Sequence, residues 1–94
     1  MERFEIGMLA KALAGHDLGK IYVILDVDGE YVYLVDGKLR TVDKPKKKKK
    51  KHVQLIKETS QTLIEKIQSN QKIQNEDIKR IIKLKLSQGG NANV

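Results

Sequence analysis

Seven lysines lie within eight consecutive positions of this chain, and their side chains carry its clearest chemistry. Ammonium groups at this density neutralise phosphates and release counterions, which is a main source of affinity for nucleic acids. Their mutual repulsion also predicts that the segment forms neither a helix nor a strand when the protein is free. The segment is interrupted only by Pro45 and contains no acidic residue. The lysines predicted to bind phosphates are Lys44, Lys46, Lys47, Lys48, Lys49, Lys50 and Lys51.

Other interpretations of this lysine segment stay open. It is also compatible with a solvated loop that adds solubility, with a nuclear import signal, or with attraction to anionic lipids. Stable membrane anchoring usually needs two signals, and the sequence has neither a myristoylation start nor a C-terminal prenylation box. Because the segment lies between predicted strands rather than at a terminus, we favour phosphate binding.

A second candidate site is the loop from Leu13 to Gly19. Gly15 and Gly19 permit positive φ angles or a close approach of the backbone. Loops of this kind bring backbone N–H groups and a few side chains up to a phosphate chain. The competing interpretation is a simple turn in which Asp17 accepts hydrogen bonds from its own backbone. The residues of this region expected to meet RNA are Lys11, Gly15, His16, Gly19 and Lys20.

The stretch Gly7–Ile24 resembles the KOW motif, a glycine-bearing loop between two strands in ribosomal proteins and transcription elongation factors. The strings 36–48 and 51–52 extend the likeness to the large-subunit ribosomal protein of the fourteen-e type and to short bacterial KOW-domain RNA-binding proteins. The resemblance covers about residues 5–56. It implies an SH3-like barrel, association with ribosomal RNA, and an RNA contact for Arg40.

The first 56 residues predict a β structure. Asp28-Gly29 and Asp36-Gly37 are strong signals for tight turns, the first for a type I′ hairpin. Apolar residues on both faces of 20–27 predict a strand that is covered on both sides. Five short antiparallel strands with tight turns favour a small, partly open barrel. The strands are expected at 8–12, 20–27, 30–35, 38–42 and 52–56.

The period of the apolar residues changes after residue 57, which predicts two helices. The first is expected from Ser60 to Ser69 with Asn70 as its stop. The second is expected to begin with Asn75 as its cap and to end at Gly89-Gly90. Its apolar face must pack on the barrel, on another copy or on a partner, and the barrel is the default expectation. That face comprises Ile78, Ile81, Ile82 and Leu86.

The chain is therefore expected to be mainly β with a short C-terminal helical pair. Residues 1–56 form an SH3-like KOW barrel that includes the lysine segment 44–51. Residues 57–88 form a helical extension, and residues 89–94 form a flexible tail.

The net charge of +7 is unevenly distributed. Residues 1–43 carry −3, residues 44–52 carry +7 and residues 53–94 carry +3, so one short segment dominates the positive field. The chain has no cysteine, which excludes disulfides and thiolate metal sites. Without a secretory signal pattern or an apolar run long enough to span a bilayer, we expect a cytoplasmic protein.

Catalysis finds little support in the sequence. The two histidines have neither a nucleophile nor metal ligands at useful spacing, so we expect no enzyme, no metal and no cofactor. Tyr31 and Tyr33 share a strand face and are expected to pack in the core rather than to stack on bases. We therefore expect a ribosome-associated protein that binds ribosomal or other structured RNA. The alternatives are a protein-interaction module that docks on RNA polymerase or a ribosomal protein, and nonspecific DNA binding.

Overall fold

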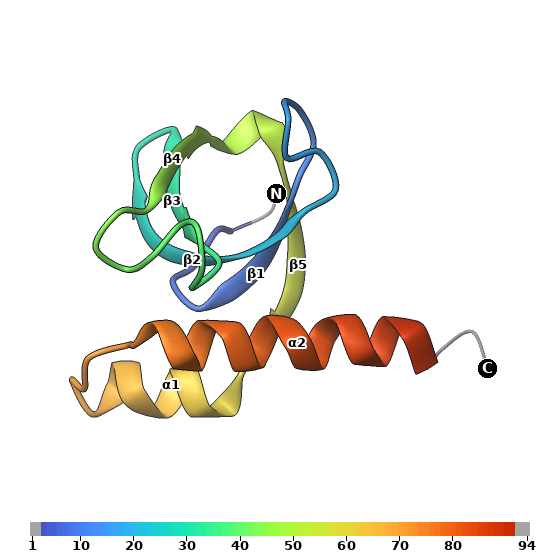
Figure 1. The fold of residues 1–94 in the computed structure, drawn as a ribbon. Coiled ribbons are helices and arrows are strands. Elements are labelled where there is room, and N and C mark those ends of the chain that lie inside the picture. The colour runs from blue at the N-terminus through green and yellow to red at the C-terminus, as the bar shows by residue number, and fades with distance from the viewer. Residues whose placement is uncertain (1–2, 92–94) are drawn as a thin grey trace.

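The structure, a computed structural model, describes residues 3–91 of the chain. Five antiparallel strands form one curled sheet in the order β4-β3-β2-β1-β5, and two helices follow at the C-terminus (Figure 1). The elements are β1 Met8–Ala12, β2 Ile21–Asp28, β3 Tyr31–Val35, β4 Lys46–Lys49, the 3₁₀ helix η1 Lys50–His52, β5 Val53–Thr59, α1 Gln61–Gln68 and α2 Asn75–Asn91. This is the expected small SH3-like barrel with a helical pair.

The 3₁₀ helix η1 connects β4 and β5, the two edge strands of the curled sheet. The N–H of Lys50 donates to the carbonyl of Glu30 at 2.8 Å, and the N–H of Leu13 donates to the carbonyl of His52 at 2.9 Å. These two bonds tie η1 to the β2–β3 hairpin on one side and to the β1–β2 loop on the other. The lysine segment is therefore an ordered part of the barrel, fixed by backbone hydrogen bonds.

Strand β2 is covered on both faces, as predicted. Tyr22 and Ile24 point into the barrel, whereas Val23 packs against the helices. The register with β3 shifts between Ile24 and Asp26, and this bulge turns Val27 back to the barrel interior. Strict alternation along the strand would place Val27 on the face of Val23, and the bulge overturns that expectation.

The helices pack on the outside of the barrel, and together they lie below it in Figure 1. Leu63 of α1 with Ile78 and Ile81 of α2 forms a second core against Leu9 and Val23. This confirms the expectation that the helical pair covers its own barrel. Burial against the sheet supplies the stability that two short helices lack alone.

Two predictions are wrong here. No strand forms at 38–42, and a strand does form in the lysine segment. Residues 37–44 form bends and turns, because the carboxylate of Asp36 accepts the N–H groups of Lys38 and Arg40, both at 2.8 Å. The fourth strand is β4, whose four residues are all lysines. Strand β5 begins one residue later than expected and continues to Thr59, past the boundary placed at residue 56.

The first hairpin also differs from its predicted form. The turn residues are Gly29 and Glu30, because Asp28 still pairs with Tyr31. Gly29 has a φ of +58°, whereas among the described non-glycine residues only Asn70 has a positive φ. A glycine at the first central position with an ordinary residue after it suits a type II′ turn rather than type I′.

The helix ends are confirmed in part. Helix α1 is flanked by Ser60 and Ser69, and Asn70 adopts the left-handed conformation that stops it. Asn75 does not cap α2: its side-chain oxygen accepts the N–H of Val42, whereas Asp77 accepts the N–H of Gln74, as in a capping box.

The C-terminal end of α2 lies further along the chain than predicted. The helix continues through Gly89 and Gly90 to Asn91, since glycine weakens a helix by only about 1 kcal/mol per residue. Lys83 and Lys85 therefore lie inside α2 rather than at its end. The remainder of the predicted tail, residues 92–94, lies outside the described residues.

Candidate nucleic-acid interface

The β1–β2 loop forms a compact turn between the first two strands. Gly15 and Gly19 have φ angles of +87° and +86°, which side chains with a Cβ resist. The N–H of Leu18 donates to the carbonyl of Gly15 at 3.2 Å, and the N–H of Gly19 donates to that of Ala12 at 2.8 Å. This backbone path points the carboxylate of Asp17 toward the barrel.

Strand β4 separates its lysines into two sets. Lys46 and Lys48 pair with Leu34 and Val32 of β3, so they share the inward face of the sheet. Lys47 and Lys49 pair with Tyr33 and Tyr31 and share the outward face. We call these pairs the inner lysines and the outer lysines.

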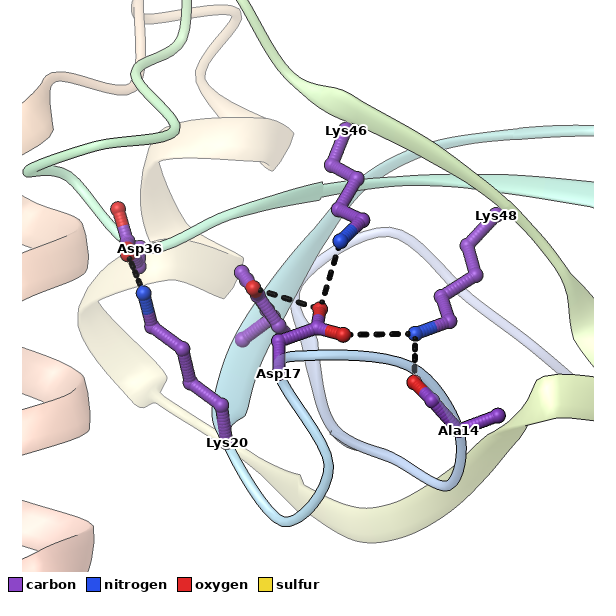
Figure 2. Close-up of polar contacts among 7 residues, drawn as sticks. Ala14, Asp17, Lys20, Asp36, Lys46 and Lys48 are labelled. Carbon is purple, nitrogen blue, oxygen red and sulfur yellow. Dashed lines mark hydrogen bonds and ion pairs between the residues drawn. The ribbon is translucent and has the colours of Figure 1, made fainter.

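Asp17 anchors the inner lysines, as Figure 2 shows. Its carboxylate lies 2.9 Å from the Nζ of Lys46 and 3.1 Å from the Nζ of Lys48, and it accepts a 2.8 Å hydrogen bond from the hydroxyl of Tyr22. Lys48 also donates to the carbonyl of Ala14 at 2.8 Å. The side chains of Asp17 and Lys48 are only 11% and 10% exposed, so this ion pair is largely shielded from water.

The protonation equilibria follow from these contacts. Burial opposes the charge on Asp17, but hydrogen bonds from Lys46, Tyr22 and Lys48 outweigh it and hold the pKa of this carboxyl well below its usual range. Burial and the adjacent carboxylate of Asp17 raise the pKa of the Tyr22 phenol. At neutral pH Asp17 is therefore a carboxylate and Tyr22 a neutral phenol.

Lys20 belongs to a second internal ion pair. Its Nζ contacts the carboxylate of Asp36 (Figure 2), which is itself buried. Burial raises the pKa of Asp36. The hydrogen bond from Lys20 and those from the N–H groups of Arg40 and Lys38 lower this pKa by more than burial raises it, so the net shift is downward. Lys20 is thus engaged within the protein.

Lys47, Lys49 and Lys51 are exposed to solvent, and Lys50 is half-buried. The Nζ of Lys47 lies 4.4 Å from the centre of the Tyr31 ring, and the Nζ of Lys50 lies 5.5 Å from that of Phe4. Lys49, Lys50 and Lys51 line a surface pocket of about 430 Å³ together with Gly29 and Glu30.

The structure brings the two predicted sites together, because Asp17 and Ala14 of the loop hold the side chains of β4. Gly15 and Gly19 shape the loop, and His16 is exposed at its surface. Arg40 and Lys44 are exposed in the segment before β4. Lys11 pairs with Ile21 and Gln54 on the other face of the sheet, apart from the inner lysines.

Sequence reasoning did not identify the anchoring role of Asp17 or Asp36. The signal available was an acidic residue near a glycine in each of the two loops of a basic protein. The prediction that Tyr31 and Tyr33 pack in the core is wrong, because both are half-exposed on the outward face whereas Val32 and Leu34 point inward. An aromatic pair interleaved with lysines is typical of surfaces that bind single-stranded nucleic acid.

The alternative docking face on α2 is largely occupied. Ile78 and Ile81 are buried against the barrel, and Ile82 packs beside them. Of the four residues proposed for a partner, only Leu86 is exposed, with 61% of its surface accessible. Ile78 and Ile81 are therefore not free to bind another protein, whereas Leu86 and part of Ile82 remain accessible.

No protein-family description matches the chain, and no curated protein matches it.

Within the described residues, no group of three His, Cys, Asp or Glu is placed to hold a metal ion. No helix of that part of the chain has the length and apolar character needed to cross a membrane.

Proposed function

We propose that this protein binds RNA through phosphate contacts and performs no catalysis. The observation that carries the proposal is the anchoring of β4 on Asp17, which fixes a row of lysines beside the glycine loop. Since Lys46 and Lys48 are held by Asp17 on the inward face of the sheet, the phosphate ligands are the other cations of the segment. These are Lys44, Lys47, Lys49, Lys50 and Lys51. We add His16 of the β1–β2 loop and Arg40 of the segment before β4 as further candidates.

Strand geometry gives this surface a regular spacing. Residues i and i+2 of a strand lie about 6.6 Å apart, so Lys47 and Lys49 present ammonium groups at an interval comparable to that of successive phosphates. Tyr31 and Tyr33 lie beside them on β3 and offer rings for stacking of bases. Asp26 and Asp28 follow on β2 and repel phosphates, so we infer that the backbone of the RNA runs along β4.

The resemblance to KOW-bearing ribosomal proteins supports RNA as the ligand, and ribosomal RNA of the large subunit as the first candidate. A cytoplasmic, ribosome-associated role follows from the same resemblance. Docking on a protein through the face of Ile78 and Ile81 is not supported, because that face is buried.

The decisive experiment is the salt dependence of RNA binding. If four of these five lysines engage phosphates, log K should fall against log salt with a slope of about −3. Replacing Lys47, Lys49 and Lys51 by Gln should lower affinity roughly a hundred-fold at about 0.1 M salt and flatten the slope by about 2. Fluorescence anisotropy with a fragment of large-subunit ribosomal RNA measures both, and duplex DNA serves as competitor.

A charge-matched control separates local contacts from net charge. Lys72 and Arg80 are exposed in the helical part, and replacing both by Gln removes as much charge as replacing Lys47 and Lys49 alone. We expect this control to retain most of its affinity. A slope close to zero, or an equal loss in the control, would overturn the proposal.

A further inference from the structure

A groove of about 960 Å³ lies between the start of β2, the turn after β3 and the exposed side of α2. Ile21, Leu39, Ile82 and Leu86 give it apolar walls. Leu39 is 81% exposed and Leu86 is 61% exposed, and large apolar side chains at this exposure commonly mark binding surfaces when they gather around one concavity.

The rim of this groove is cationic. The residues that line the groove include four lysines and one acidic residue, Asp36. The lysines are Lys20, Lys38, Lys79 and Lys83. The carboxylate of Asp36 is buried and already paired with Lys20. Lys38 and Lys83 are exposed, so their charges face whatever enters the groove.

We propose that this groove binds an acidic amphipathic helix of a partner protein. Apolar side chains of that helix would enter between Leu39 and Leu86, and its carboxylates would meet Lys38 and Lys83. An apolar floor with a charged rim suits helix-in-groove recognition, whereas phosphate binding gains nothing from leucines. The site lies on the loop and α2, apart from the outer lysines, and does not depend on the proposed RNA binding.

The probe is a fluorescein-labelled synthetic peptide of about four helical turns, with leucines at positions i, i+3, i+4 and i+7 and glutamates elsewhere. A scrambled peptide of the same composition keeps the charge but loses the apolar face. Both are titrated by fluorescence anisotropy against the full chain with the substitutions Lys47→Gln, Lys49→Gln and Lys51→Gln. These substitutions remove the attraction of the peptide to the outer lysines and to Lys51.

We expect Leu86→Asp, Leu39→Asp and Lys83→Glu each to weaken binding of the amphipathic peptide about ten-fold. Leu84→Asp is the matched control, because Leu84 lies on the same helix at 57% exposure but does not line the groove. It should bind as the parent does. Circular dichroism checks that each variant keeps its fold, which the exposure of these side chains favours.

Three outcomes would overturn the proposal. The amphipathic peptide fails to bind at millimolar concentration, the scrambled peptide binds equally well, or Leu84→Asp weakens binding as much as Leu86→Asp. If Leu86→Asp instead weakens binding of ribosomal RNA, the groove belongs to the RNA surface and the protein-partner proposal fails while the RNA proposal stands.

Discussion

The inner and outer lysines of β4 are identical in composition and adjacent in sequence, yet the barrel gives them different roles. Lys46 and Lys48 contact the carboxylate of Asp17, and Lys48 is nine-tenths covered. Lys47 and Lys49 project from the opposite face beside the tyrosines. The difference arises because successive side chains of a strand alternate between faces.

The comparison shows how a strand of four lysines is stable at all. Alternation separates neighbouring ammonium groups onto two sides of the sheet, and the carboxylate of Asp17 lies between the two that point inward and attracts both. Half of the charge therefore stabilises the fold, and the other half remains available to a ligand. A buried charge without its partner is strongly destabilising, so the inner set depends on the loop.

The largest effect is expected from Asp17→Ala, which leaves both inner lysines and the Tyr22 hydroxyl without their shared acceptor. We expect a loss of about 3 kcal/mol in the free energy of unfolding, measured by urea denaturation. Asp28→Ala is the control, because Asp28 is exposed and the charge change is the same. Equal stability of the two variants would contradict the anchoring role.

A paired substitution sharpens the comparison within β4. Lys48→Met should lower stability by about 2 kcal/mol, because it removes the bonds to Asp17 and Ala14 while keeping the length of the side chain. Lys49→Met should change stability by less than about 0.5 kcal/mol. At about 0.1 M salt, affinity for RNA should fall roughly five-fold for Lys49→Met and little for folded Lys48→Met. Equal effects of the two substitutions on both measurements would remove the distinction between inner and outer lysines.

The stability should fall in acid, and Asp17 should account for part of that fall. Its pKa is lowered in the folded state, as are the pKa values of Asp36 and Asp77. For Asp77 the first cause is the hydrogen bond from Lys66. The unfolded chain therefore binds more protons near pH 4, and stability is lost as the pH falls below that value.

Each such carboxylate contributes at most about 1.4 kcal/mol per pH unit. The midpoints of urea denaturation, recorded at about pH 6, about pH 4 and about pH 3, measure this loss of stability. Asp17→Asn should show a shallower decline than the parent chain. A parallel decline would mean that the inner lysines do not hold the charge of Asp17.

The smallest effect concerns the outer lysine Lys47, whose Nζ lies over the ring of Tyr31. Tyr31→Leu should lower stability by about 0.5 kcal/mol through loss of this exposed cation–π contact. Its effect on single-stranded RNA should be larger, about 1 kcal/mol, if a base stacks on the ring. Tyr31→Phe keeps the ring and should restore both values, whereas failure of this rescue would exclude stacking as the cause.

The fold was largely predictable from local patterns. The strand at 8–12, the turns near Gly29 and Gly37, and the helices marked by the spacing of Leu63, Ile78 and Ile81 depend on short segments, and each lies where it was expected, although the first turn is of a different type. The strand at 38–42 was mispredicted because Asp36 closes its loop with two backbone N–H groups. A carboxylate competing for backbone donors leaves little trace in hydrophobic periodicity.

The sequence alone determined that the chain has one segment of concentrated positive charge and one glycine loop, because each of these features consists of consecutive residues. It did not determine which lysines face inward, because a run of identical residues has no pattern from which a face can be assigned. Only the pairing of β4 with β3 and the approach of Asp17 across 29 residues decided that division. Strand register and long-range ion pairs depend on how the whole chain closes, and tertiary packing alone supplies that information.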